Sequence, residues 1–127
     1  MKRAAELALR VIASAPGTAE VLVVLDPEFA GFAGHFPGEP VLPGMCHVDL
    51  ALRAAALVVG ADLELVAVDR ARFLRKSLPG EELSIRLVLR PSVNAVTSIA
   101  ADHSIGGELA AELRLVVTTR TAPPARP

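Results

Sequence analysis

Apolar and polar residues alternate along much of the chain, a pattern that predicts β-strands. The clearest alternation runs over residues 81–90, where every second side chain from position 83 to position 89 is Leu or Ile. The same period returns over residues 108–119, so we expect a second long strand there. A weaker alternation over residues 94–102 lies between them, and residues 103–107 end in paired glycines that suit a tight hairpin. Three consecutive antiparallel strands are therefore expected.

The first half of the chain holds two more expected strands. Residues 18–25 alternate in the same way, and residues 63–73 form a strand that is closed by the turn at Leu78-Pro79-Gly80. The stretch 4–15 fits a helix or a strand equally well.

One segment lacks this alternation and predicts a helix. Residues 45–59 are rich in Leu and Ala, which are strong helix formers. Pro43 sits where a helix can begin without losing a hydrogen bond, and Gly60 sits where one can end in a left-handed turn. Only three helix positions are polar or charged: His47, Asp49 and Arg53. A helix that is apolar on every side is normally covered by protein, so the pattern predicts an α+β fold with an antiparallel sheet wrapped around one long central helix.

Length and composition indicate one globular domain. The 127 residues, 52% hydrophobic and 21% charged, suit a single domain at residues 1–120 followed by a disordered tail at residues 121–127. No apolar run approaches the ~20 residues that a membrane-spanning helix needs. Glu6 and Arg10 interrupt what would have to be the apolar part of a signal peptide, so we expect a cytoplasmic protein without membrane contact.

Cysteine content and charge exclude several classes of site. Cys46 is the only cysteine, which excludes an internal disulfide and a cysteine-cluster metal site. The net charge of −1 and the absence of Trp and Tyr offer neither a field that attracts a polyanion nor aromatic platforms for bases. We therefore expect no nucleic-acid partner.

Asp49 needs a partner, because a buried, unpaired carboxylate costs several kcal/mol. The simplest partner is Arg53, four residues further on the same helical face. His47 is only two positions away and points to another face, which favours a structural histidine.

The segment Gly34–Gly44, GHFPGEPVLPG, holds three prolines and three glycines and precedes the helix directly. His35 lies in this stiff loop, where a histidine has either a functional or a merely structural role. At Pro43-Gly44 the free amide groups and the positive end of the helix dipole can polarise a carbonyl oxygen. With Asp49, these features make up an acid/base histidine, a carboxylate and an oxyanion site.

This loop and helix closely resemble the signature of the hotdog-fold 3-hydroxyacyl-acyl-carrier-protein dehydratases of fatty acid synthesis. In that family a histidine follows the glycine of the loop, and a helical acidic residue comes fourteen positions later; His35 and Asp49 match this spacing. Residues 68–73 and 78–81 look like the family's next strand and turn. The likeness covers roughly residues 18–119.

The resemblance implies a dimer with two sites at the subunit interface, where the histidine of one chain faces the helical acid of the other. It implies that His35 removes a proton from the carbon next to the thioester carbonyl, while Asp49 protonates or orients the leaving hydroxyl. The amide of Gly44 then hydrogen-bonds the thioester oxygen. The substrate is carried on the phosphopantetheine of acyl carrier protein or coenzyme A, and no metal or redox cofactor is expected.

The resemblance also implies a substrate tunnel beside the helix, lined by Phe36, Pro43, Met45 and Arg53. The basic residues Arg72, Arg75 and Lys76 are candidates for contacting the carrier protein or the phosphates of its arm. The alternative is that they form a solvated basic strand end.

Two positions depart from the family pattern. The commoner family form has glutamate at the position of Asp49, and the branch that also isomerises the double bond has aspartate. The family usually carries glutamine where this chain has Arg53, and an arginine so close favours the ionised carboxylate. We therefore expect a specialised substrate from a polyketide or polyene pathway.

Two alternatives to a homodimeric dehydratase stay open. One is an acyl thioesterase on the same fold, since fold does not determine function. The other is a non-catalytic hotdog subunit that forms a heterodimer with a catalytic partner.

Overall fold

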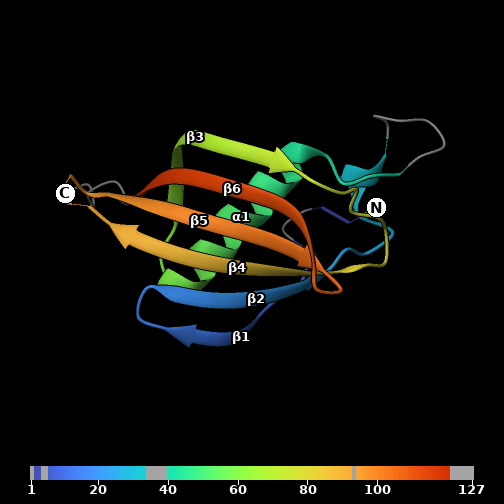
Figure 1. The fold of residues 1–127 in the computed structure, drawn as a ribbon, viewed down its shortest axis with the longest axis horizontal. Helices are drawn as coiled ribbons and strands as arrows, with labels where there is room; N and C mark the ends of the chain where they lie inside the picture. Colours follow the sequence, from blue (N-terminus) through green and yellow to red (C-terminus); the bar gives the residue numbers. More distant parts are fainter. Residues whose placement is uncertain (1, 4–5, 34–39, 93, 121–127) are drawn as a thin grey trace, which may run out of the picture.

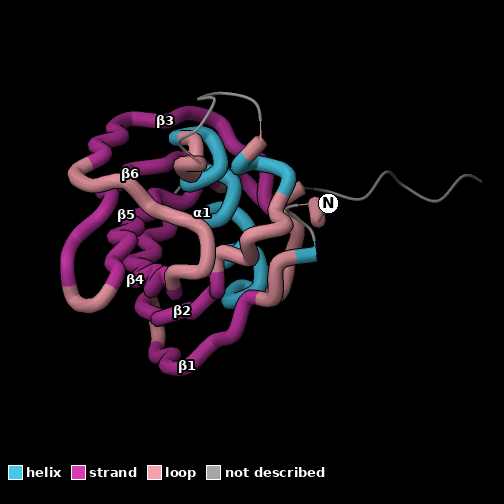
Figure 2. The backbone as a smooth tube through the Cα atoms, turned by 90° about the vertical axis from the view of Figure 1, so that its right-hand side faces the viewer, coloured by secondary structure: helices cyan, strands magenta, loops and turns pink. Residues whose placement is uncertain are grey.

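The computed structural model describes residues 2–3, 6–33, 40–92 and 94–120. Within these ranges, six strands form one antiparallel sheet, and one long helix lies against one of its faces (Figures 1 and 2). The elements in chain order are β1 Leu9–Ala15, β2 Thr18–Val24, the 3-10 helix η2 Ala30–Phe32, α1 Gly44–Val59, β3 Leu63–Phe73, β4 Glu82–Pro91, β5 Val96–Ile105 and β6 Glu108–Thr119. The sheet order is β1-β2-β4-β5-β6-β3, so β1 and β3 are its edges.

The strands agree with the alternation in the sequence. β4, β5 and β6 are neighbours in the sheet, which confirms the three consecutive antiparallel strands. Within the segment 4–15, which fitted either a helix or a strand, residues 9–15 form β1, and β1 pairs antiparallel with β2.

One boundary differs from the expectation in a way that matters for the site. β5 does not end at Asp102 but continues to Ile105, because its last residues pair with β6. The turn shrinks to Gly106-Gly107, whose φ angles of 59° and 83° glycine adopts without strain. His103 therefore lies inside a strand rather than in the turn.

The helix begins and ends where its flanking residues indicate. Pro43 is extended and precedes the first residue of α1, and Gly60 ends the helix with a left-handed φ of 76°. The amide of Gly60 donates a hydrogen bond to the carbonyl of Ala56. These contacts confirm the predicted start and stop signals.

The expectation that α1 is covered on every side is wrong for the single chain. The sheet covers only the helix face that carries the six buried residues His47, Val48, Leu50, Ala51, Ala54 and Ala55. On the rest of the helix, Met45, Leu57 and Val59 remain exposed. One chain supplies one sheet, and one sheet can cover one face of a helix.

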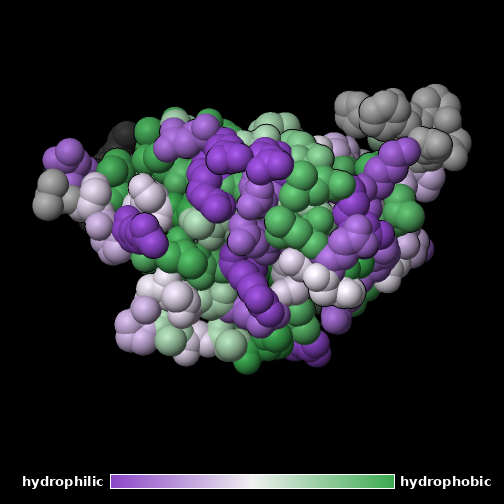
Figure 3. All heavy atoms as spheres, in the orientation of Figure 1, coloured by the Kyte–Doolittle hydropathy of each residue, from purple (hydrophilic) through white to green (hydrophobic). Residues whose placement is uncertain are grey.

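The two faces of the sheet have different roles. The face toward α1 provides the core with side chains such as Val21, Ile85, Ile99 and Leu113, all nearly inaccessible to solvent. The outer face carries a band of hydrophilic side chains across the strands (Figure 3). This band includes the ion pair of Arg114 with Asp102 at 3.4 Å. Because an exposed pair contributes at most about 1 kcal/mol, burial of the apolar face dominates the stability.

In the part of the chain that the structure describes, no helix combines the length and the apolar character that crossing a bilayer requires.

Candidate active site

A cavity opens at the start of α1, between the helix and the segment that follows β3. We call it the helix-start cavity; it measures about 390 Å³ and is lined by residues 41–44 and His47 on one side and by residues 73–77 on the other. Backbone hydrogen bonds fix both walls: the amide of Leu42 donates to the carbonyl of Ser77 at 2.9 Å, and the amide of Leu74 donates to Ala110 at 2.8 Å. The cavity therefore lies between two segments that are held in register.

Gly44 is the first residue of α1 and forms part of the cavity wall. The first amides of a helix have no acceptor within the helix, and Pro43 offers no side-chain cap. A Cβ at Gly44 would lie 2.9 Å from the Cζ atom of Phe73, closer than real Cβ atoms come. Glycine here permits both the close approach of the Phe73 ring and access to the helix amides.

The other predicted site residues on the helix fall into separate places. Pro43 lines the helix-start cavity, whereas Met45 is 68% exposed. Asp49 is half-buried in the second turn. Arg53 is also half-buried and lines a second cavity with Leu57, Gly60 and Asp62, among others. His35 and Phe36 lie outside the described residues, so their predicted roles stay predictions.

Asp49 acts electrostatically on its neighbour in the first helical turn. Burial raises the pKa of the Cys46 thiol, and the nearby Asp49 carboxylate raises this pKa further. The thiol is therefore protonated at neutral pH and is a poor nucleophile. Asp49 and Arg53 occupy positions i and i+4 of α1, and an ion pair between them stays a prediction.

The three basic residues proposed for carrier binding differ in their contacts. Arg72 forms an ion pair with Glu112 at 3.1 Å, and Arg75 forms one with Glu81 at 2.9 Å. Arg75 and Lys76 line the helix-start cavity. Two of the three residues thus have acidic partners within the chain. Neither the carrier-binding role nor the solvated basic strand end is tested by these contacts, and both stay predictions.

A pair of buried histidines begins at the cavity wall. His47 on α1 and His103 on β5 approach with their Nδ1 atoms 2.8 Å apart, and both side chains are almost fully buried. Burial lowers the pKa of His47 to about 4 and that of His103 to about 3, so both rings are neutral near pH 7. Sequence reasoning missed His103 as a site residue. The alternation along β5 could have identified it, because His103 occupies the same inward-facing positions as Ile99, Ala101 and Ile105.

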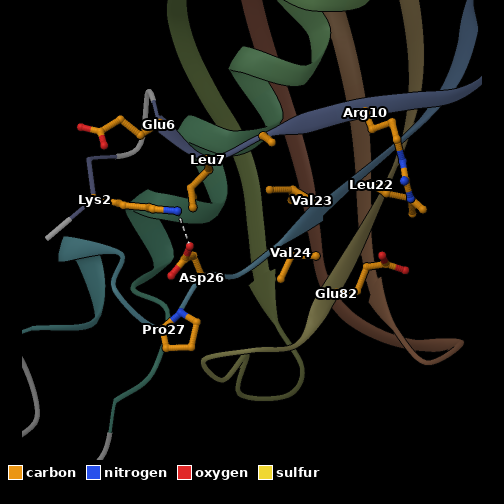
Figure 4. A pocket seen from close by; sticks show the side chains of 11 residues that line it. Lys2, Glu6, Leu7, Arg10, Leu22, Val23, Val24, Asp26, Pro27 and Glu82 are labelled. Atoms are coloured by element: carbon orange, nitrogen blue, oxygen red, sulfur yellow. Dashed lines mark hydrogen bonds and ion pairs between the residues drawn. The ribbon is translucent and has the colours of Figure 1, made fainter.

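A third cavity lies between the amino-terminal segment and β2 (Figure 4). Lys2 and Asp26 form an ion pair at 2.7 Å beside it. The Lys2 ammonium and the amide of Glu28 hold the pKa of Asp26 below its usual value. None of the predicted active-site residues that the structure describes lines this cavity.

Within the described ranges of the chain, no group of three or more His, Cys, Asp or Glu side chains is arranged to hold a metal ion.

Comparison with known families points to a dehydratase. Residues 12–106 match the model of the ApeI-like family, described as ApeI dehydratase. The chain is 32% identical over 97 residues to the 3-hydroxyacyl-[acyl-carrier-protein] dehydratase FabZ of Haemophilus influenzae and 34% identical over 100 residues to that of Cupriavidus metallidurans. These matches cover 70% and 72% of this chain. The chain spans only about two thirds of the relatives' own length, 66% and 67%.

Solved structures share the same architecture. The dehydratase heterocomplex ApeI:P from Xenorhabdus doucetiae matches with a TM-score of 0.68 and 21% identity, over 85% of this chain and 96% of that one. The Escherichia coli PaaI protein matches with a TM-score of 0.70 and 16% identity, over 89% of this chain and 80% of that one. The predicted hotdog fold is confirmed: an antiparallel sheet curves around one long helix.

Proposed function

This chain belongs to the ApeI-like dehydratase family, and on that premise we propose that it removes water from a 3-hydroxyacyl thioester to give the trans-2-enoyl thioester. The observation that carries the proposal is the position of Gly44: the helix of this dehydratase-family chain begins on the wall of a cavity, with Asp49 in its next turn. A thioester oxygen placed at the helix start would meet unbonded amide donors.

The reaction needs a base, an acid and a site for negative charge. His35 takes the proton from the carbon next to the thioester carbonyl, and the electron pair moves toward the thioester oxygen. The Gly44 amide hydrogen-bonds this oxygen, a contribution on the order of 3 kcal/mol for a typical oxyanion donor. The bond between the next carbon and its hydroxyl then breaks, and the hydroxyl leaves as water with a proton from Asp49. A proton returned from His35 to Asp49 completes the cycle.

Asp49 has a second task besides donating the proton, because its carboxyl group also hydrogen-bonds and orients the leaving hydroxyl. The amide of asparagine can keep this orienting contact, so we propose that Asp49→Asn keeps part of the activity. No comparable substitution keeps the proton-accepting role of His35.

The test follows dehydration directly. Purified protein is incubated with a 3-hydroxyacyl carrier protein or a 3-hydroxyacyl-CoA, and the loss of 18 mass units is measured. We expect His35→Ala to lower kcat at least about 100-fold, the usual share of one acid/base group, and Asp49→Asn to lower it less. Wild-type turnover that His35→Ala leaves unchanged would contradict the mechanism. The position of the double bond in the product also shows whether Asp49 supports isomerisation.

The same incubation separates the alternatives. A thioesterase releases free thiol, whereas a dehydratase leaves the thioester intact. A non-catalytic subunit is inactive alone and gains activity when a catalytic hotdog partner is added. The ApeI:P structure is itself a heterocomplex, which makes this second outcome worth testing.

We propose a homodimer as the active form, with the substrate bound at the interface. β3 is an edge strand whose Val66 and Val68 are exposed, and α1 exposes Met45 and Leu57. An edge strand with apolar side chains favours pairing with another chain. A second copy would supply the cover that α1 lacks in the single chain.

A further inference from the structure

His47 and His103 come from elements that are distant in sequence, yet they form one polar contact inside the core. Their Nδ1 atoms are 2.8 Å apart, so one nitrogen must carry the proton and the other must accept it. The Nε2 atom of His103 is buried and has no hydrogen-bond partner among the described residues. This unpartnered atom decides which ring donates.

The two possible arrangements differ in what they leave buried. If His47 donated, the proton of His103 would sit on Nε2 and an N–H group would be buried without an acceptor. If His103 donates, only a lone pair is left at its Nε2. Orphaned buried N–H groups are the rarer of the two in proteins, so the second arrangement is favoured. His47 then carries its own proton on Nε2.

His47 lines the helix-start cavity together with Gly44 and Ser77. A helical side chain leans toward the amino-terminal end, which places the His47 ring over the first turn of α1. The Phe73 ring packs against it, with the ring centroids 5.5 Å apart. The Nε2 atom of His47 therefore belongs to a side chain that lines the cavity beside the first helix amides.

Ser77 provides a second and independent pointer to a ligand. Its side chain is only 1% exposed, and its hydroxyl has no hydrogen-bond partner among the described residues. A buried hydroxyl without a partner is costly unless something binds it. The residues that line the cavity thus include three neutral donors: the amide of Gly44, the Nε2–H group of His47 and the hydroxyl of Ser77.

We propose that His47 and Ser77 donate hydrogen bonds to a carbonyl oxygen of the acyl-thioester substrate, and that His103 is a positioning residue that keeps the His47 proton on Nε2. This inference rests on the proposed function and deepens it. The acceptor is either the thioester oxygen or an amide oxygen of the pantetheine arm, which share the same hydrogen-bonding chemistry. Neutral donors suit a neutral carbonyl because no charge has to be buried.

The first test determines which ring nitrogens of His47 and His103 carry protons, and it needs no enzymatic turnover. Nitrogen-15 NMR of the histidine-labelled protein distinguishes the two tautomers, and single His variants assign the signals. We expect a proton on Nε2 of His47 and on Nδ1 of His103. A crotonyl-CoA analogue with an amide in place of the thioester should shift the His47 Nε2 signal. A proton on Nδ1 of His47, or no shift at saturating analogue, would overturn the proposal.

The second test uses matched pairs of variants. The side-chain nitrogen of glutamine can replace histidine Nε2, and that of asparagine can replace Nδ1. We therefore expect His47→Gln and His103→Asn to keep most of kcat/KM, whereas His47→Met, His103→Leu and Ser77→Ala each lower it about tenfold, the scale of one hydrogen bond. Ser84→Ala is the control, because the Ser84 hydroxyl binds Glu20 instead.

A comparison of two substrates identifies the oxygen that His47 and Ser77 bind. The same acyl group is supplied as the CoA thioester and as an S-ethyl thioester, which lacks the arm amides. If the variants lose kcat/KM with both substrates, the bound atom is the thioester oxygen. If the variants raise KM only with the CoA thioester, the bound atom is an amide oxygen of the arm. Folded His47→Met and Ser77→Ala proteins with wild-type kinetics on both substrates would refute the proposal. An inactive wild-type protein would instead refute the proposed function, and the NMR result would still decide the role of His47.

Discussion

At the scale of single residues, one neighbouring side chain explains why position 44 is glycine. The nearest atom of the Phe73 ring lies 2.9 Å from the place that a Cβ at Gly44 would take, and the same ring packs against His47. Gly44 thus sets the position of Phe73, and Phe73 in turn covers His47. The packing of the cavity wall therefore requires a residue without a Cβ at position 44.

A double-mutant cycle tests this packing. Gly44→Ala should destabilise the protein by about 1 kcal/mol, the low end of overpacking costs, because the half-exposed Phe73 ring can move aside. In a Phe73→Ala background the same change should be neutral or stabilising, since alanine is the better helix former. Urea unfolding of the four proteins gives the coupling energy. A cost of Gly44→Ala that is equal in both backgrounds would rule out the Phe73 explanation.

The buried histidine pair predicts a loss of stability in mild acid. Both folded-state pKa values, about 4 and about 3, lie below the value of about 6.5 expected in the unfolded chain. Near pH 7 both states are mostly neutral at these positions. As the pH falls from 6.5 toward 4, the unfolded chain takes up protons that the folded protein refuses, so stability falls.

The size of this effect can be measured. Between pH 7 and pH 5 the two histidines together should lower the free energy of unfolding by about 4 kcal/mol. Urea unfolding at the two pH values gives the difference, and a His47→Gln, His103→Asn double variant should lose most of it. An equal pH dependence in the double variant would mean that other groups are responsible.

At the scale of elements, the sequence was sufficient for most of the strands and for the helix ends. β3 and β6 have the predicted bounds, because alternation and turn residues are local signals. The contact between His47 and His103 was not predictable in the same way. It depends on a strand that runs three residues past its expected end and on the packing of α1 against β5, which no local pattern records. The place of His35 relative to Asp49 depends on tertiary structure in the same way.

The end of α1 offers a test at this scale. Gly60 has a φ of 76°, and a Cβ added there would meet nothing within 4 Å. The cost of Gly60→Ala is therefore purely conformational, and we expect a loss of about 1 kcal/mol in the free energy of unfolding. Gly60→Asn should cost less, since asparagine tolerates the left-handed region better. Urea unfolding measures both, and a neutral Gly60→Ala would show that the helix can end in another conformation.

At the scale of the whole molecule, the two edges of the sheet are both open in the single chain. Val66 and Val68 are exposed on β3, and Val11 and Ile12 are exposed on β1. Only β3 continues into the helix-start cavity, through Phe73 and the residues that follow it. The proposed dimer with its sites at the subunit interface therefore favours β3 as the interface.

Matched charge substitutions on the two edges distinguish them. Val68→Lys should convert the dimer to a monomer, because a lysine on an edge strand opposes pairing with another strand. It should also abolish dehydration if His35 and Asp49 meet across the interface. Ile12→Lys places the same charge on the opposite edge and should leave both properties unchanged. Analytical ultracentrifugation with parallel activity assays tests this. A Val68→Lys protein that stays dimeric would move the interface away from β3, and an active monomer would mean that each chain holds a complete site.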